Sequence, residues 1–455
     1  MREGSLEAPT RHPIAWQDPD FTDRTKTEAE MHRVFDICHT CRRCFNLCDA
    51  FPRLFDLIDG SETGELDSVP VADYARVADA CTLCDMCFMT KCPYVPPHEF
   101  NVDFPHLMLR YRAVQHKERG TPQARRALVE TDRNGRLAGA VAPLANWANK
   151  NGVTRGLLEK VAGVDRQAAL PVFHGRTFTM RAKRRGPPVD TAAPAAGRKA
   201  VLYATCFVNY NDPGIGEATR AVLARNGVET EVLHPRCCAM PKLEQGDLAA
   251  VATAAREVAA ALGPWIDKGY DVVALVPSCA LMLKFEWPLI LPNEAAIAKL
   301  ARATFDVSEY IVDIAKKEGL APGLESLDGG VTLQLACHAR AQNMGAKAAE
   351  MLRLVPGIDL AVIERCSGHG GSWGVLKENF PTALKVGRPV ARQALKNGKT
   401  FLSSECPLAG MHIRQGMEML AEGEALPERA LHPIELFARA YGIAGAAVRQ
   451  EARRS

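Results

Sequence analysis

Apolar residues recur at helical spacing in the first quarter of the chain and give way to short apolar runs in its second half. Residues 103–118 carry apolar side chains three or four positions apart, which predicts an amphipathic helix. Thr27 and Glu30 have the spacing of a capping box and predict a helix that begins before Met31. The pattern therefore predicts a helical domain at residues 25–120.

The second half of the chain repeats one order of predicted elements: a strand, a helix, a second strand and later a third. The strands are expected at 200–205, 229–233 and 272–276 in the first copy and at 331–336, 360–363 and 400–402 in the second. This order is typical of α/β units with parallel strands. We therefore predict an α/β protein with an α-helical N-terminal domain and two repeated α/β domains, at residues 200–325 and 326–440.

The segment between these parts, residues 121–199, is predicted to be a basic helical connector that ends in a linker rich in Gly, Ala and Pro. Residues 101–200 hold 19 basic and 7 acidic residues, a net charge of +12, whereas residues 1–100 hold 10 and 18, a net charge of −8. Apolar positions among basic ones at 137–170 are typical of a segment that touches a membrane or a partner, and also of helices packed on their own protein.

The overall composition is that of a soluble globular protein. Of the 455 residues, 47% are hydrophobic and 24% charged, which excludes wholesale disorder and a fibrous repeat. No apolar run is long enough for a transmembrane helix, and residues 1–7 lack the apolar stretch of a secretory signal. We therefore expect a cytoplasmic, reducing location, where the 15 cysteines do not form a disulfide framework.

Eight of these cysteines form two closely spaced quartets. The first has the spacing C-x2-C-x2-C-x3-C and the second C-x2-C-x2-C-x4-C; their members are Cys38, Cys41, Cys44 and Cys48, and Cys81, Cys84, Cys87 and Cys92. Three thiolates within seven residues reach three corners of an iron–sulfur cube, and the fourth ligand typically comes from the other motif. The expected ligand sets are Cys38, Cys41 and Cys44 with Cys92, and Cys81, Cys84 and Cys87 with Cys48.

Two zinc ions are the alternative for these eight thiols. Zinc sites usually take their ligands as separated C-x2-C pairs around a tetrahedral ion. A triple C-x2-C-x2-C that occurs twice suits cubes better. The sequence therefore predicts two [4Fe–4S] clusters in a ferredoxin-like helical domain.

The other seven cysteines follow predicted strands of the repeated unit. They are Cys206, Cys237, Cys238 and Cys279 in the first copy and Cys337, Cys366 and Cys406 in the second. Ligands of open α/β sheets bind beyond the carboxyl ends of the strands. Each copy is therefore expected to bring its cysteines to one site.

Three motifs resemble a known family of iron–sulfur proteins. They are Cys-Cys-Ala-Met-Pro-Lys at 237–242, Pro-Ser-Cys-Ala-Leu-Met-Leu-Lys at 277–284 and Ala-Cys-His-Ala-Arg-Ala-Gln-Asn at 336–343. They resemble the CCG domains of heterodisulfide reductase-related proteins and of the C subunit of anaerobic glycerol-3-phosphate dehydrogenase. The latter joins a helical two-cluster ferredoxin domain to two CCG domains, an order that covers nearly the whole of this chain.

The chain departs from the heterodisulfide reductase pattern, which the resemblance gives as five cysteines in each repeat. Met282 stands at the fifth position of the first repeat, and Ser367 and Ala409 replace cysteines of the second. The four cysteines of the first repeat suffice for one conventional cube. The three of the second leave a ligand position for His338, Ser367, His369, water or a substrate; the alternative is a repeat that packs without holding a cluster.

The sequence contains no evident flavin, nicotinamide or haem motif, so two-electron chemistry is expected from a partner. Our first hypothesis is an electron-transfer subunit that relays electrons from a flavoprotein dehydrogenase or another donor to a quinone or a partner protein. The second is a terminal reductase with its chemistry at a CCG-like cluster, and the third is a non-catalytic iron–sulfur sensor or scaffold. We expect no nucleic-acid partner, and peripheral contact with the inner face of the cytoplasmic membrane is an extension of the first hypothesis.

Overall fold

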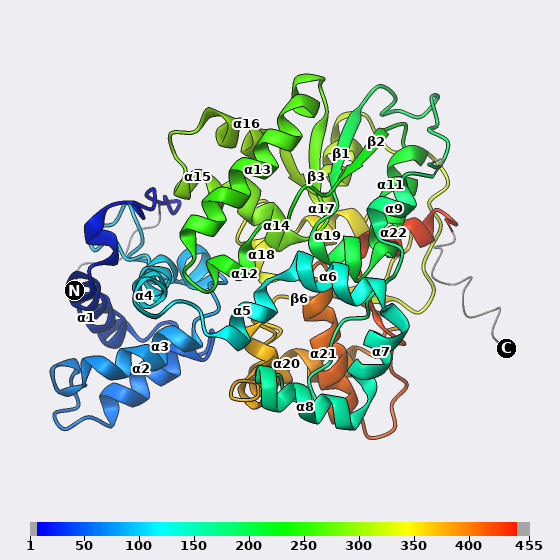
Figure 1. Cartoon of the computed structure of the whole chain (residues 1–455). Helices are drawn as coiled ribbons and strands as arrows, with labels where there is room; N and C mark the ends of the chain where they lie inside the picture. Colours follow the sequence, from blue (N-terminus) through cyan, green and yellow to red (C-terminus); the bar gives the residue numbers. More distant parts are fainter. Residues whose placement is uncertain (1–6, 185, 444–455) are drawn as a thin grey trace.

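The computed structural model describes residues 7–184 and 186–443 (Figure 1). Residues 1–6, on which the expected absence of a secretory signal largely rests, lie outside the described part. Within the two described ranges, no helix combines the length and the apolar character needed to cross a membrane.

The N-terminal region is helical, as predicted. Its helices are η1 (Pro19–Thr22), α1 (Arg24–Cys41), α2 (Ala50–Asp59), η2 (Leu66–Ser68), η3 (Val71–Asp73), α3 (Tyr74–Ala80), the π-helical turn η4 (Cys87–Lys91) and α4 (Phe104–Arg119). The helix begins before Met31, as predicted, but the capping box expected at Thr27 and Glu30 was wrong. The side chain of Asp23 caps α1 by accepting from the Lys26 amide at 2.8 Å, and Thr27 lies buried inside the helix, where its hydroxyl donates to the Asp23 carbonyl.

The connector forms five helices and packs on both repeats. They are α5 (Gln123–Val129), α6 (Thr131–Ala140), α7 (Ala142–Lys150), α8 (Gly152–Ala162) and α9 (Phe178–Ala182). The amide of Lys377 in the second repeat donates to the Gly163 carbonyl, and the Asp165 amide donates to the Val375 carbonyl, both at 2.8 Å. Gly135 of α6 lies against the ring of Tyr210 in the first repeat. The connector is therefore part of the packed structure and not a free spacer.

Two parallel four-stranded sheets form the rest of the molecule, as Figure 1 shows for the first of them beside α13 and α11. Their orders are β2-β1-β3-β4 and β6-β5-β7-β8. The strands are β1 (Lys199–Tyr203), β2 (Glu229–Leu233), β3 (Asp271–Ala274) and β4 (Thr304–Asp306), and β5 (Val331–Gln334), β6 (Leu360–Ile363), β7 (Phe401–Ser404) and β8 (Ala430–Leu431). The prediction of repeated parallel α/β units is confirmed, and β4 and β8 are strands that the sequence analysis missed.

Helices cover these sheets in an order that also repeats. In the first repeat they are α10 (Cys206–Tyr210), α11 (Pro213–Arg225), α12 (Met240–Leu243), α13 (Leu248–Asp267), α14 (Pro277–Leu281), η5 (Met282–Glu286), α15 (Trp287–Ile290), α16 (Ala295–Ala303) and α17 (Val307–Lys317). In the second they are α18 (Cys337–Arg340), α19 (Lys347–Leu352), η6 (Trp373–Val375), α20 (Phe380–Asn397), α21 (Pro407–Leu420) and α22 (Pro433–Ala440). Since α22 packs against α11 and α19 against α17, the two repeats interlock.

One hydrophobic core runs from the N-terminal helices through the first sheet to the inner strand of the second. Parallel strands covered on both faces are expected to be apolar along their whole length. Four of the five β1 residues are buried, and all four β5 residues are buried. A smaller cluster between β6, β7, α20 and α21 completes the second repeat.

Arg11 joins three parts of the molecule through a buried ion-pair network. Its guanidinium donates to both carboxylate oxygens of Asp85, at 2.8 and 2.9 Å, and to Asp103 at 2.9 Å. It also donates to Glu286 of the first repeat at 3.3 Å and lies over the ring of Phe88. The segment before α1 thus fastens the N-terminal helices to the first repeat.

We expect Arg11→Ala to lower the free energy of unfolding by about 3–5 kcal/mol, because it removes the cation that pairs with the buried carboxylates of Asp85 and Glu286 and with the half-buried carboxylate of Asp103. Arg24→Ala is the matched control, since Arg24 pairs with Glu118 near the surface, where a pair contributes about 0.2–1 kcal/mol. Denaturant unfolding of the anaerobically purified protein measures both values. Equal losses in the two variants would contradict the structural role of Arg11.

Candidate iron–sulfur sites

The first predicted ligand set lies around one cavity in the N-terminal helical region. Cys38, Cys41, Cys44 and Cys92 line this cavity together with the aromatic rings of α2. Burial raises the pKa of Cys38, and the neighbouring thiol of Cys92 raises it further. Burial likewise raises the pKa of Cys44 to about 12. The fourth thiol of this group therefore comes from the second motif, as expected for exchanged ligands.

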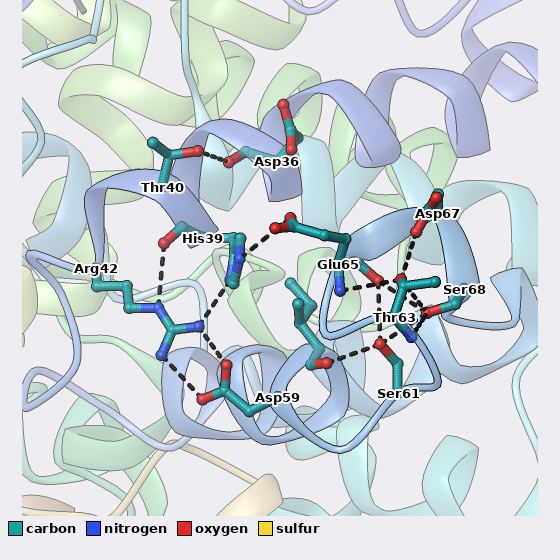
Figure 2. Close-up of polar contacts among 11 residues, drawn as sticks. Asp36, His39, Thr40, Arg42, Asp59, Ser61, Thr63, Glu65, Asp67 and Ser68 are labelled. Carbon is teal, nitrogen blue, oxygen red and sulfur yellow. Dashed lines mark hydrogen bonds and ion pairs between the residues drawn. The ribbon is translucent and has the colours of Figure 1, made fainter.

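A polar network holds the backbone that carries the first motif (Figure 2). Arg42 ends α1 in the left-handed conformation, with φ at 49°. Its guanidinium donates to the carboxylate of Asp59 at the end of α2 and to the His39 carbonyl. His39 in turn lies 3.6 Å from the carboxylate of Glu65. These contacts fix the turn that directs Cys41 and Cys44 to the same cavity.

The second predicted set is also brought together. Burial raises the pKa of Cys48, and the neighbouring thiols of Cys84 and Cys81 add to the increase. The pKa of Cys87 is raised by burial and by the thiols of Cys84, Cys81 and Cys48. The backbone between these cysteines turns at Leu83 and Asp85, which have φ values of 49° and 64°. A loop wound in this way directs several thiols toward one point.

The four cysteines of the first repeat form two close pairs beyond the ends of β1, β2 and β3. The sulfur atoms of Cys206 and Cys237 lie 3.7 Å apart, and those of Cys238 and Cys279 lie 3.2 Å apart. Interactions with the thiols of Cys206 and Cys238 lower the pKa of Cys237. Cys237 is thus the thiol of this group that is most readily ionised.

The connector takes part in this site through Asp132, which the sequence analysis did not identify. One carboxylate oxygen of Asp132 accepts from the Cys237 amide at 2.7 Å, and the other lies 2.7 Å from Nε2 of His234. The preceding residue, Thr131, lies beside the thiols of Cys206 and Cys237. No local pattern marks Asp132, since it lies about one hundred residues from its partners.

The three cysteines of the second repeat follow β5, β6 and β7 in the same way. Burial raises the pKa of Cys337, and the thiols of Cys84, Cys366 and Cys406 raise it further. The Gly368 amide donates to the sulfur of Cys366 at 3.4 Å. This site therefore lies beside the second N-terminal motif, a contact between distant parts that the spacing of the cysteines could not predict.

The three candidate non-cysteine ligands have different surroundings. Nδ1 of His338 lies 2.9 Å from the Ser278 hydroxyl, and its Nε2 lies 3.4 Å from the Leu83 carbonyl, so both ring nitrogens have protein neighbours. The hydroxyl of Ser367 accepts from the His369 amide at 3.4 Å. The ring of His369 packs on that of His412, at 6.0 Å between centroids, and its buried Nε2 has no hydrogen-bond partner among the described residues.

A cavity of about 520 Å³ opens between the N-terminal region and the second repeat. Thiols of both parts line it, with four basic and two acidic side chains around them; the lining includes Cys48, Cys84, Cys337 and Cys366, with Lys91, Arg340, Arg365, Lys385, Asp49 and Glu364. The cysteine groups are therefore neighbours in space, in the order first motif, second motif, second repeat and first repeat. The link to the first repeat is the proximity of Cys406 to Cys279.

The donor sets suit iron–sulfur clusters. Each N-terminal group consists of four thiols, mainly apolar side chains surround the first group, and burial and neighbouring thiols raise the pKa values of Cys38, Cys48 and Cys87. Thiols placed together in this way become stable thiolates only when a metal compensates their charge. No three His, Cys, Asp or Glu side chains among the described residues are arranged to hold a single metal ion.

Comparisons with known proteins agree with this architecture. Residues 200–284 match the model of the CCG cysteine-rich domain. The chain is 28% identical over 320 residues to the C subunit of anaerobic glycerol-3-phosphate dehydrogenase from Escherichia coli, a match that covers 69% of this chain and 76% of that protein. It is 30% identical over 187 residues to lactate utilization protein A of Bacillus cereus, which covers 39% of this chain and 74% of that protein. The chain belongs to this family of CCG-domain proteins.

A further CCG-related similarity is more distant. The B subunit of the fumarate reductase (CoM/CoB) from Methanothermobacter marburgensis is 24% identical over 259 residues, which is 56% of this chain and 48% of that protein. The relatives are subunits of oxidoreductases or proteins of lactate utilisation. The resemblance noted from the cysteine motifs is therefore confirmed.

The third position of the CCG motif needs a left-handed backbone in both repeats. Ala239, which follows Cys237 and Cys238, has φ at 62°, and Gly368, which follows Cys366 and Ser367, has φ at 79°. A Cβ on Gly368 would clash with the Ala383 carbonyl oxygen. The first repeat thus tolerates alanine in a conformation that glycine adopts at lower cost.

We expect opposite effects on the free energy of unfolding when Ala239 is replaced by glycine and when Gly368 is replaced by alanine. Ala239→Gly should stabilise the protein by about 1 kcal/mol, because it removes the strain of a side chain in the left-handed region. Gly368→Ala should destabilise it by more than about 2 kcal/mol, since strain is added to a steric clash. Unfolding by denaturant measures both effects, and a loss of stability in Ala239→Gly would contradict this explanation.

Proposed function

We propose that the protein is an iron–sulfur electron-transfer subunit of an oxidoreductase, which relays electrons between a redox partner protein and a quinone or another acceptor. The observation that carries the proposal is the uninterrupted series of cysteine groups from the N-terminal helices to the first repeat. All fifteen thiols are buried or partly buried, and none is exposed. A series of this kind suits the passage of electrons through the interior.

In the proposed relay, each part of the chain has one task. The N-terminal domain, at about residues 25–120, holds two [4Fe–4S] clusters through the two exchanged cysteine sets. The repeats at residues 200–325 and 326–440 hold one or two more. Clusters at these positions supply one-electron chemistry, and the partner, a flavoprotein dehydrogenase or another donor, supplies the two-electron step.

Support for the partner comes from the relatives, because the glycerol-3-phosphate dehydrogenase and fumarate reductase proteins are by name the C and B subunits of larger enzymes. We propose by analogy that this chain also works in a complex. The proposal places it on the cytoplasmic side, at the inner face of the membrane. The net charge of +12 over residues 101–200 favours such peripheral contact with an anionic surface.

A terminal reductase remains the second candidate, and one observation favours it. The cavity beside Cys337 and Cys366 is open and has the basic side chains of Lys91, Arg365 and Lys385 on its walls. Among the described residues the structure gives no ion pair for these three side chains, so they are available to an anionic ligand. In this candidate function, a substrate reaches the second repeat through the cavity and receives electrons there.

Metal analysis of the anaerobically purified protein tests the cluster assignment. We expect about eight irons from the two N-terminal motifs and about four more from the first repeat, with a broad absorption near roughly 400 nm. Cys238→Ser should lose about one cluster's iron, since it removes one of four thiols, whereas Ser367→Cys should lose none. Colourless protein with two zinc ions, or an unchanged iron content after loss of both Cys206 and Cys237, would contradict the assignment.

The relay itself is tested by reoxidation. After chemical reduction under argon, a water-soluble quinone should reoxidise the N-terminal clusters, as followed by electron paramagnetic resonance. We expect Cys238→Ser to slow this reoxidation if the acceptor takes electrons at the first repeat. Reduced clusters that no quinone and no partner protein reoxidises would contradict a relay function.

A further inference from the structure

Helix α8 has its polar and apolar faces reversed. Arg155 and Glu159 are buried, with relative exposures of 4% and 8%, whereas Val153, Leu157 and Val161 are 83%, 61% and 70% exposed. A helix on the surface of a globular protein normally turns its apolar stripe toward the core. The three apolar residues follow each other at intervals of four, so they share one outward face.

The buried polar face explains why α8 keeps this orientation. Arg155 donates to the carbonyls of Arg166 and Ala168, at 3.2 and 2.7 Å. Glu159 accepts from the guanidinium of Arg166 at 2.9 Å and from the ammonium of Lys377 in the second repeat at 3.1 Å. Because these contacts exist only in this orientation, the apolar face cannot turn inward without loss of the network.

The two preceding helices, which pack against each other and of which α7 packs on α8, also carry exposed apolar side chains. Leu137 of α6, Val141 at the turn, and Leu144 and Trp147 of α7 are 65%, 51%, 62% and 55% exposed. Helices α7 and α8 pack on each other and lie at the outer edge of the molecule (Figure 1). We call the seven side chains of residues 137–161 the connector face: Leu137, Val141, Leu144, Trp147, Val153, Leu157 and Val161. Large exposed apolar surfaces mark sites of interaction.

The exposed charges of the helices that carry the connector face are of one sign. Among residues 131–162, the basic side chains Arg133, Arg136, Lys150 and Lys160 are exposed. The only two acidic residues of this range are turned inward. Asp132 contacts the first repeat, and Glu159 lies on the buried face of α8. Apolar residues beside exclusively basic ones are typical of helices that lie in the headgroup region of an anionic membrane.

We propose that the connector face is the surface by which the protein lies on an anionic lipid bilayer, with α7 and α8 in the plane of the interface. Trp147 occupies the headgroup level, where the indole ring is favoured. Lys150 and Lys160 contact lipid phosphates. The proposal refines the peripheral location given above and does not depend on the electron relay. A protein partner fits less well, because the exposed charges include no acidic group for a mixed-charge interface.

Flotation with lipid vesicles tests this proposal on the full-length, anaerobically purified protein. We expect wild-type protein to float with vesicles that contain phosphatidylglycerol and to bind phosphatidylcholine alone more weakly. Leu157→Ser with Val161→Ser should reduce binding roughly tenfold, since two apolar side chains no longer insert. The matched control is Leu354→Ser with Met419→Ser, two exposed apolar residues of the second repeat, which should bind like wild type.

Lys150→Ala with Lys160→Ala separates the electrostatic contribution. This variant should bind phosphatidylglycerol vesicles more weakly and lose part of its sensitivity to salt, whereas the serine variant should keep that sensitivity. Wild-type protein that stays unbound with both vesicle types overturns the proposal, as does a protein partner that binds the connector face when vesicles do not. Equal flotation of wild type and the Leu157/Val161 variant overturns the choice of face.

Iron content and quinone reoxidation in solution, measured on the same variants, distinguish this proposal from the relay. Both readouts should equal those of the wild type, because the exchanged side chains are exposed and lie outside the cysteine sites. If a variant loses its iron together with its binding to vesicles, misfolding explains the loss of binding. That result would overturn a direct role of the connector face.

Discussion

The burial of the cysteine thiols is the constraint on which the rest of this structure depends. Thiols in an apolar interior resist ionisation, which is why the pKa values of Cys38, Cys48 and Cys87 are raised. They become thiolates only in the presence of a compensating cation. Their partners come from segments far apart in the chain, as Cys84 and Cys366 show by their proximity. The group around Cys84, Cys337 and Cys366 therefore forms only when the N-terminal region and the second repeat pack together, and the loss of a cluster there is expected to loosen this packing.

The sequence predicted those parts of the molecule that depend on local patterns. Cysteine spacing indicated that Cys92 lies with the first motif and Cys48 with the second, and apolar runs indicated six of the eight strands in the described part of the chain. The other two, β4 and β8, consist of three and two residues, too few for a periodic signal. Each leads into a capping box, Asp306 with Glu309 and His432 with Glu435, which a search of the repeat could have found. The sequence analysis instead expected a capping box at Thr27. That side chain is buried inside the helix, and Asp23 caps the helix.

Long-range electrostatics could not be predicted in the same way. Arg11 contacts carboxylates 74, 92 and 275 positions away, and no pattern near Arg11 indicates them. The basic character of the connector was evident from composition. Its orientation was not, since composition cannot reveal that Asp132 and Glu159 turn inward while apolar side chains turn outward. The structure thus shows which side chains of the connector are exposed, which the net charge of the segment could not reveal.

The positions of the two CCG sites also bear on their roles in the proposed relay. The first repeat has four cysteines, but Cys238 and Cys279 are buried, and Asp132 of the connector bonds the backbone of its motif. The second repeat has three cysteines, and Cys337 and Cys366 line the open cavity beside the second N-terminal motif. A ligand from solution therefore reaches the incomplete set more readily than the complete one. In the proposed relay, the thiols of the second repeat lie beside the second N-terminal motif, and an open ligand position there suits exchange with an acceptor.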